Sequence, residues 1–265
     1  MDQNRQNGIL ALLRPSHYIK NLFVILPLFF SGRISEGNLL EEAMLAFLSF
    51  CLIASSVYVF NDIHDLEEDR NHPQNQQRPI ASGVVSVRTA YLLDLLLTLA
   101  AFLLAWVVNI QLLYVVIGYK LMNILYTLLI KKIAIVDVMV LSLGFVLRLL
   151  AGSVATGVQL TEWIIIMTYL LSLLIVLGKR RNDAIAFEQK EIVLRAAVRG
   201  YNSLFLNQAM VLLSSVIIVS YILYTISPEI QNRLHTQYLF TTVFWVLAGV
   251  LRYLQLLFVF RLDDN

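Results

Sequence analysis

The residues most able to do chemistry lie together in the stretch 61–83, directly after an apolar run. The pattern N-D-x-x-D-x-x-x-D is formed there by Asn61, Asp62, Asp65 and Asp69. If one helix continues through them, the three aspartates occupy positions i, i+3 and i+7 and share one face. Carboxylates this close repel one another unless a cation lies between them, and oxygen ligands of this kind suit Mg²⁺. The pattern therefore predicts a magnesium site formed by these four residues.

Three arginines follow the acidic pattern closely: Arg70, Arg78 and Arg88. Protein-bound Mg²⁺ usually takes one or two carboxylates together with the phosphates of a substrate. Arginine in turn binds phosphate through charge-assisted hydrogen bonds. Carboxylates followed by arginines thus indicate a metal–diphosphate site. The alternative is an acidic, solvated loop between two membrane spans.

Composition places the chain in a membrane. Of its 265 residues 58% are hydrophobic and 14% are charged, and the mean hydropathy is +0.73. Repeated long apolar segments in such a chain indicate membrane spans. The single cysteine, Cys51, lies in one of these segments, so it forms no intramolecular disulfide and is expected to be a packing residue. We expect residues 1–265 to form a single polytopic membrane domain, with membrane lipids around it.

The apolar segments predict an all-α integral membrane bundle of about eight (eight or nine) transmembrane helices. The first run, residues 21–30, is short and contains Pro27, which predicts a kinked helix. Seven further segments are long enough to span a bilayer, which needs about 20 residues. They cover residues 43–60, 89–108, 111–130, 135–155, 163–178, 203–225 and 237–260.

Lys and Arg residues predict the orientation of these spans. They crowd the N-terminal segment, the loop 61–88, the pair Lys131 and Lys132, and the loop 179–200, whereas the opposite loops carry almost none. The positive-inside rule then puts both long loops and both termini in the cytoplasm, which in a bacterial cell means the inner membrane. Since the basic residues hug the membrane, they give no indication of nucleic-acid binding. Arg252, inside the last segment, leaves the final span least secure.

Several charged residues fall inside the predicted spans. Asp94, Lys120 and Arg148 each interrupt an apolar segment. A charge at such depth is costly and normally faces the bundle interior or an aqueous cavity. For Lys120, a functional role and a structural pair with Asp94 remain equally open.

Two further groups of polar residues mark cytoplasmic exits. Tyr126 and Lys131 lie at one exit, and the run Gly178-Lys-Arg-Arg-Asn-Asp183 lies at another. Consecutive cations can be a topogenic signal or an anchor for anionic lipid headgroups. Beside an acidic cytoplasmic loop, however, a basic one can bind a second phosphate directly. A bundle that brings the two loops together would hold a metal-bound diphosphate next to that phosphate.

These motifs resemble those of the UbiA prenyltransferase superfamily of integral-membrane enzymes. Within it, the chain is most similar to the branch that attaches phosphoribose to a polyprenyl phosphate. Two departures are His17-Tyr18, where Gln-Trp is usual, and a C-terminal third without a recognisable motif. The matching segments besides the acidic motif are Arg14-Pro-Ser-His-Tyr-Ile-Lys20-Asn21, Arg78-Pro-Ile-Ala-Ser-Gly83, Tyr126-Thr-Leu-Leu-Ile-Lys131 with Asp137, Gly144-Phe-Val-Leu-Arg148-Leu-Leu-Ala-Gly152 and Gly178-Lys-Arg180.

The resemblance implies a helical bundle with a lateral opening to lipid and a polar cavity facing the cytoplasm. It implies Mg²⁺-dependent transfer of phosphoribose from 5-phosphoribosyl-1-pyrophosphate (PRPP) to a polyprenyl phosphate of decaprenyl type, with release of pyrophosphate, in cell-envelope biosynthesis. Aromatic prenyltransferases of the superfamily resemble one another in having a second acidic motif where this chain has Gly178-Lys-Arg-Arg. An aromatic prenyltransferase of quinone biosynthesis that uses a prenyl diphosphate is the alternative, and a non-enzymatic lipid or solute transporter is a third reading.

The resemblance and the residue chemistry together assign roles. The expected catalytic residues are Asp65, Asp69, Lys131 and Arg78. A homo-oligomer is possible. Lys20, Lys179 and Arg180 are the candidates for holding the acceptor phosphate or the ribose 5-phosphate. The expected substrate-binding residues are Lys20, Asn61, Asp62, Arg70, Arg78, Tyr126, Lys131, Arg148, Lys179 and Arg180.

Overall fold

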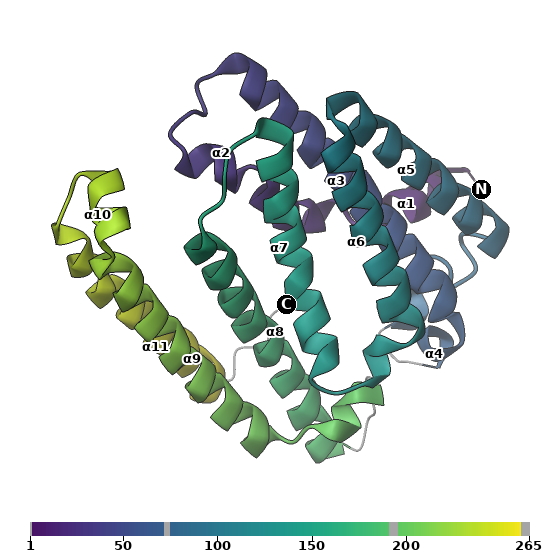
Figure 1. Ribbon diagram of the computed structural model, residues 1–265. Coiled ribbons are helices and arrows are strands. Elements are labelled where there is room, and N and C mark those ends of the chain that lie inside the picture. The colour runs from purple at the N-terminus through teal and green to yellow at the C-terminus, as the bar shows by residue number, and fades with distance from the viewer. Residues whose placement is uncertain (1, 72–74, 191–195, 261–265) are drawn as a thin grey trace. The chain divides into compact units, whose positions relative to one another are not determined.

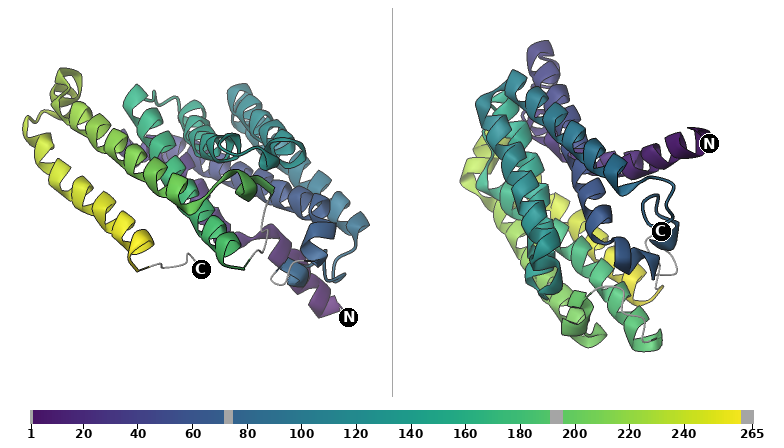
Figure 2. Two further views of the ribbon diagram at one scale, coloured as in Figure 1. Left: turned by 90° about the horizontal axis from the view of Figure 1, so that it is seen from below. Right: turned by 90° about the vertical axis from the view of Figure 1, so that its right-hand side faces the viewer.

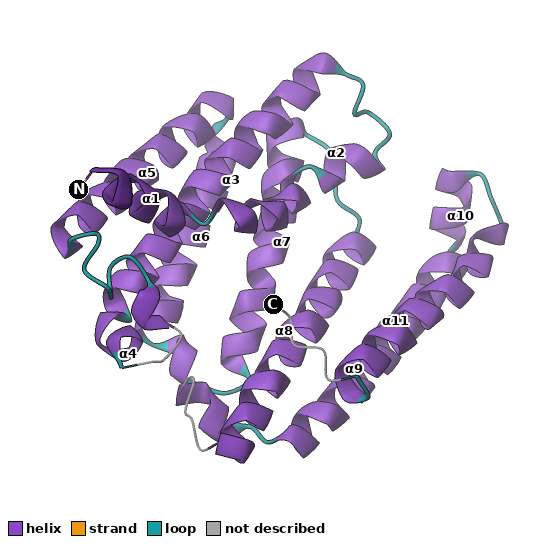
Figure 3. Ribbon diagram, turned by 180° about the vertical axis from the view of Figure 1, so that it is seen from behind, coloured by secondary structure: helices purple, strands orange, loops and turns teal. Residues whose placement is uncertain are grey.

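The computed structural model describes residues 2–71, 75–190 and 196–260. Within these ranges all regular structure is helical and no strand occurs (Figure 3). Eight helical stretches are long and apolar enough to cross a membrane, which confirms the predicted number of spans.

The first half of the described chain contains seven α-helices and three 3₁₀ segments. They are α1 (Asp2–Leu13), η1 (Pro15–Val24), α2 (Leu26–Phe30), α3 (Gly37–His64), α4 (Leu66–Arg70), η2 (Asn75–Gln77), α5 (Val87–Val108), α6 (Ile110–Leu128), η3 (Ile130–Lys132) and α7 (Val136–Thr156). The second half adds α8 (Glu162–Lys190), η4 (Ala196–Gly200), α9 (Ser203–Ile226), α10 (Pro228–Leu234), η5 (Tyr238–Thr242) and α11 (Val243–Phe258).

Two compact units can be distinguished. One contains Met1–Lys131 with Gly144–Leu160, and the other contains Lys132–Leu143 with Thr161–Asn265. Helix α7 therefore begins in the second unit and ends in the first. That the two units act as one functional domain stays a prediction.

The core of the first unit forms where α3 packs along α5 and α6 contacts both helices (Figure 1). Small residues allow close approach: Ala46 and Ala101 are fully buried, and the Ser49 hydroxyl donates to the Ala101 carbonyl over 2.9 Å. Ser86 and Asn109 cap the starts of α5 and α6 with their side-chain oxygens. These three helices form the scaffold that carries the acidic motif.

A buried ion pair joins α5 and α6 in this unit. The Lys120 ammonium lies 2.6 Å from the Asp94 carboxylate and 2.6 Å from the Ser56 hydroxyl of α3. The predicted pair is thus present, and it satisfies two charges that would be costly in lipid.

The first predicted span is more divided than expected. Instead of one short kinked helix, the chain forms α1, the 3₁₀ segment η1 and α2, and proline occupies the first turn of both η1 and α2. Gly152 of α7 makes room for this segment, because a Cβ there would lie 1.7 Å from the Val24 carbonyl oxygen. The break in the helix therefore comes from proline and from close packing against α7.

The second unit is built on α8, α9 and α11. Helix α9 packs against both α8 and α11, and the left view of Figure 2 shows α11 running beside α9. Met210 and Leu206 of α9 are fully buried in this core. Arg181 of α8 donates to the Asn207 side chain (2.6 Å) and to the Leu257 carbonyl (3.0 Å), which ties the three helices together.

Helix α8 corrects one prediction. The apolar pattern predicts that this span ends at residue 178 and that the basic run lies in a loop over 179–200. In the structure α8 continues through Lys190. Because successive helical residues point in different directions, the cations separate: Lys179 is exposed, whereas Arg180 and Arg181 are buried. The partners of Arg181 lie in α9 and α11, so its charge is satisfied inside the bundle. Helix α8 can therefore continue past Lys179, the first charge of the basic run.

Candidate functional site

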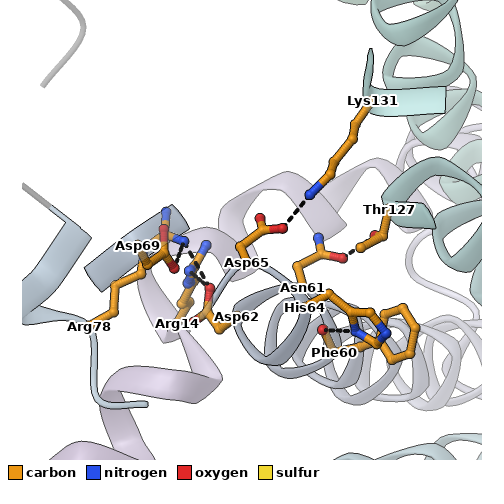
Figure 4. A network of polar contacts seen from close by, with 10 residues as sticks. All are labelled: Arg14, Phe60, Asn61, Asp62, His64, Asp65, Asp69, Arg78, Thr127 and Lys131. Atoms are coloured by element: carbon orange, nitrogen blue, oxygen red, sulfur yellow. Dashed lines mark hydrogen bonds and ion pairs between the residues drawn. The ribbon is translucent and has the colours of Figure 1, made fainter. Parts of the chain in front are cut away.

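The acidic motif spans a break between two helices. Helix α3 ends at His64, Asp65 is its C-cap with φ −90° and ψ 5°, and α4 begins at Leu66. The condition that one helix continues through the motif is therefore not met, although the Asp65 N–H still bonds to the Asn61 carbonyl and the Asp69 N–H to the Asp65 carbonyl, both over 2.8 Å. The break divides the four motif side chains into two groups (Figure 4).

The first group contains Asp62 and Asp69, which are both 3% exposed. Nη1 of Arg78 lies 2.7 Å from Oδ2 of Asp69 and 3.2 Å from Oδ1 of Asp62. Nη2 of Arg14 lies 2.7 Å from the same Asp62 oxygen. The guanidinium groups of Arg14 and Arg78 thus converge with the carboxylates of Asp62 and Asp69 (Figure 4).

The second group faces α6 and the turn that follows it. The Lys131 ammonium pairs with the Asp65 carboxylate, and the Thr127 hydroxyl donates to the Asn61 side-chain oxygen. Asp65 and Lys131 are both about a quarter exposed. These contacts bring together residues 66 positions apart, and they place Lys131 beside the acidic motif.

His64 takes no part in either group. Its ring stacks on Phe60 with centroids 4.1 Å apart, and its Nδ1 lies 2.9 Å from the Phe60 carbonyl. In Figure 4 the ring lies on the far side of the helix from Asp62 and Asp69. The expectation that His64 is not a general base agrees with this position.

The donor set can be tested against Mg²⁺. The three aspartates and the one asparagine of the motif offer the hard oxygen ligands that Mg²⁺ prefers. In the part of the chain that the structure describes, no three His, Cys, Asp or Glu side chains converge on one metal position. Instead each carboxylate has a cationic partner. The residue types therefore suit Mg²⁺, and Arg14, Arg78 and Lys131 lie beside these candidate ligands.

The other predicted binding residues of the first unit lie on three different elements. Arg70 is exposed at the end of α4, and Tyr126 is buried on α6. Lys20 is partly exposed on η1.

Arg148 is 5% exposed and lies in a separate polar cluster of the same unit. Its guanidinium donates to the Asn21 side-chain oxygen (2.7 Å), the Gly144 carbonyl (2.8 Å) and the Tyr119 hydroxyl (2.9 Å). It also lies 5.0 Å from the centroid of the Tyr119 ring. With these contacts, Arg148 braces η1 against α6 and α7. The structure does not place it among the motif carboxylates.

A second charged cluster lies within the second unit. Arg180 is paired with Asp137, which is 0% exposed, through Nε and Oδ2 at 2.6 Å, and with Asp183 at 3.2 Å. The Tyr201 hydroxyl donates to Asp137 (2.7 Å) and accepts from the Ile135 N–H (2.5 Å). Burial and the bond to Asp137 both raise the pKa of Tyr201, so its hydroxyl stays a donor at physiological pH.

Several residues of these clusters were not among the predicted site residues, and Arg14, Thr127 and Tyr201 are three of them. Arg14 belongs to the motif that carries the family resemblance, so its position there was the available indication. Thr127 lies in the Tyr126–Lys131 segment, four residues before Lys131. Tyr201 follows a long polar stretch, and no pattern in the sequence connects it with Asp137.

The fold and the paired charges at the end of α3 define a membrane-embedded transferase. The chain belongs to the UbiA prenyltransferase family, whose model matches residues 23–188. It is an integral membrane enzyme, a prenyl or phosphoribosyl transferase.

Its curated relatives come from bacteria. The chain is 33% identical over 238 residues to decaprenyl-phosphate phosphoribosyltransferase of Mycolicibacterium smegmatis, which covers 88% of this chain and 75% of that protein. It is 29% identical over 226 residues to the protein of that name from Corynebacterium glutamicum, covering 84% and 68%. These names place the chain among prenyl-phosphate transferases.

Solved structures share its fold. A UbiA homologue from Archaeoglobus fulgidus bound to GPP and Mg²⁺ superimposes with a TM-score of 0.76 at 19% identity, covering 97% of this chain and 89% of that one. A UbiA homologue from Aeropyrum pernix gives 0.64 at 14% identity, covering 97% and 90%. At these identities the likeness concerns the helical fold.

Proposed function

We propose that this enzyme transfers 5-phosphoribose from PRPP to a polyprenyl phosphate of decaprenyl type and releases pyrophosphate, with Mg²⁺ as cofactor. The observation that carries the proposal is the pairing of Asp62, Asp65 and Asp69 with Arg14, Arg78 and Lys131. A magnesium diphosphate offers a cation to such carboxylates and anionic oxygens to such cations. The names of the bacterial relatives support the choice of substrates.

The donor diphosphate is assigned to the acidic motif. Asn61, Asp65 and Asp69 would hold Mg²⁺ with assistance from Asp62, and the bound ion would neutralise charge on the diphosphate. Lys131 lies in η3 and Arg78 lies in the loop after η2, so these two cations can contact the diphosphate from two sides. Both cations would stabilise the charge that develops on the leaving group.

The transfer step follows from the chemistry of the two substrates. The bond between C1 of the ribose and the diphosphate oxygen breaks, and C1 gains oxocarbenium character. An oxygen of the lipid phosphate attacks C1 from the opposite face and forms the new C–O bond. A phosphate monoester is already anionic near neutral pH, so no general base is needed. This agrees with a motif in which His64 points away.

The acceptor phosphate is assigned to lysines. Lys20 lies on η1 and is partly exposed, and Lys179 is exposed on α8. Arg180 was a candidate for the same role, and its contacts with Asp137 and Asp183 make it the less accessible of the three. We therefore propose Lys179 as an acceptor-binding cation and keep Lys20 as a separate candidate for the acceptor phosphate or the ribose 5-phosphate.

The decisive experiment supplies purified enzyme with PRPP, a polyprenyl phosphate and Mg²⁺ and measures pyrophosphate and phosphoribosyl lipid. We expect both products in equal amounts, and their loss when EDTA removes the metal. Turnover of a prenyl diphosphate with an aromatic acceptor, but not of PRPP, would identify an aromatic prenyltransferase instead. Lipid or solute movement without Mg²⁺ and without pyrophosphate release would identify a transporter.

A further inference from the structure

Arg14 adopts a backbone conformation that its sequence disfavours. Its φ of 49° and ψ of 59° lie in the left-handed region, which non-glycine residues rarely occupy. Arg14 also precedes Pro15, and the proline ring pushes the preceding residue toward extended conformations. Strained residues of this kind persist only where surrounding contacts hold them, and they cluster at ligand sites.

The contacts of the Arg14 side chain show where this strain places its charge. Nη2 lies 2.7 Å from Oδ1 of Asp62, and the guanidinium carbon lies 5.0 Å from the centroid of the Tyr58 ring. Both partners belong to α3, 48 and 44 residues further along the chain, and the side chain is 25% exposed. The strained turn thus delivers a guanidinium into the acidic motif, where Figure 4 shows it beside Arg78.

Arg78 already satisfies the nearby carboxylates. It contacts both Asp62 and Asp69, so the buried charge of Asp62 would keep a partner without Arg14. A guanidinium has five N–H donors, and Nη2 is the only nitrogen of Arg14 with a hydrogen-bond partner among the described residues. Arg14 can therefore bind an anion without leaving Asp62.

We propose that Arg14 is a further donor-binding residue, whose guanidinium binds a phosphate group of PRPP beside Arg78. The inference rests on the proposed function, because it takes the donor diphosphate to lie at the acidic motif. It assigns Arg14 to the donor and not to the lipid acceptor, since Arg14 shares an aspartate oxygen with Arg78. The alternative is a structural brace that only fixes the turn before η1.

Three variants separate the side chain from the backbone. Arg14→Gln removes the charge and keeps the strain, Arg14→Gly removes both, and Arg14→Lys keeps the charge without the planar fork. We expect the KM for PRPP to rise about tenfold or more in the first two variants and less in the third. We expect kcat and the KM for polyprenyl phosphate to stay within about twofold of wild type. Arg14→Gly should melt at or above the temperature of Arg14→Gln.

Arg33 provides a matched control. It is an exposed arginine that pairs with Glu36 through two contacts of 2.7 and 2.8 Å in the loop before α3. Arg33→Gln also removes an arginine–carboxylate pair, and we expect it to leave both KM values unchanged.

A binding readout keeps the test independent of turnover. Magnesium pyrophosphate should raise the melting temperature of the wild-type enzyme, since a ligand that binds the folded state stabilises it. The increase should be smaller in Arg14→Gln and unchanged in Arg33→Gln. An unchanged KM for PRPP together with a full thermal shift in Arg14→Gln would show that Arg14 is only a brace. If Arg14→Gln does not fold, Arg14→Lys decides by the same two measurements.

The failure of the inference and the failure of the proposed function give different results. If the wild-type enzyme turns over PRPP and Arg14→Gln does so with the same KM, only the role of Arg14 is wrong. If the wild-type enzyme does not use PRPP, the proposed function is wrong. The thermal shift with magnesium pyrophosphate then still shows whether Arg14 contributes to a diphosphate site.

Discussion

Asp65 and Asp69 share a motif but have different surroundings. Asp69 is 3% exposed and held by Arg78, whereas Asp65 is partly exposed at the helix break and paired with Lys131. A helix that continued without interruption would have aligned both on one face. The break at Asp65 instead distributes the negative charge between cations from two elements, so each aspartate has its own partner before any ligand binds.

Asp65→Asn and Asp69→Asn test the role of these charges. Each substitution keeps the shape of the side chain and removes its charge. We expect turnover with PRPP to fall ~10²-fold or more, because an interaction of several kcal/mol with the metal diphosphate is lost. Glu67 and Glu68 are exposed on α4 between the two aspartates, so Glu67→Gln and Glu68→Gln are matched controls that should keep full turnover. Near-normal turnover in both aspartate variants would leave the motif as a solvated acidic loop.

At the scale of elements, α8 carries its charges in two different ways. Lys179 is exposed, whereas Arg180 forms a buried pair with Asp137 of α7 that Tyr201 extends. Removing one partner of a buried ion pair leaves the other charge uncompensated. Size and charge at position 180 therefore matter for the packing of α7 against α8, while Lys179 remains accessible to an anion.

Substitutions at the two neighbouring positions should affect different properties: folding stability at position 180 and the KM for polyprenyl phosphate at position 179. Arg180→Gln should destabilise the protein by about 3 kcal/mol, because Asp137 loses its cation, and Asp137→Asn combined with Arg180→Gln should recover most of the loss. Lys179→Gln should leave the melting temperature unchanged and raise the KM for polyprenyl phosphate. Thermal unfolding and steady-state kinetics measure the two effects. If Arg180→Gln is fully stable and its KM for polyprenyl phosphate is raised, Arg180 and not only Lys179 binds the acceptor phosphate.

The sequence was sufficient for features that depend on local pattern. The eight spans follow from apolar runs, and the acidic motif and Arg78 were identified from residue type and spacing. Lys131 was identified with the help of the family resemblance. The turn at Arg14 and the continuation of α8 were not predicted, because each depends on partners far along the chain. Arg14 requires Asp62, 48 positions away, and Arg180 requires Asp137, 43 positions away. A local sequence pattern, which covers one helix or one loop, contains only one member of each pair.

At the scale of the whole molecule, the distribution of Lys and Arg predicts that the acidic motif and the end of α8 face the cytoplasm. A cytosolic donor such as PRPP requires this orientation. The same rule predicts that the short connection between α2 and α3, in which Ser35 is exposed, faces the opposite side.

Single cysteines in a Cys51→Ser background test the orientation. In intact cells, cysteines at Gln77 and Glu188, both exposed, should resist an impermeant thiol reagent, whereas a cysteine at Ser35 should react. All three should react after the cells are opened, which controls for accessibility. Ready labelling at Gln77 and Glu188 in intact cells would contradict the cytoplasmic assignment and the access of a cytosolic donor.

The packing of Val24 against Gly152 has a consequence for biogenesis. The segment that carries Arg14 and Lys20 is synthesised before its partners Asp62, Arg148 and Gly152. The chain must therefore be made as far as Gly152 of α7 before η1 can take its final position against that helix. The packing of η1 is thus completed only after α3 to α6 and most of α7 have been synthesised.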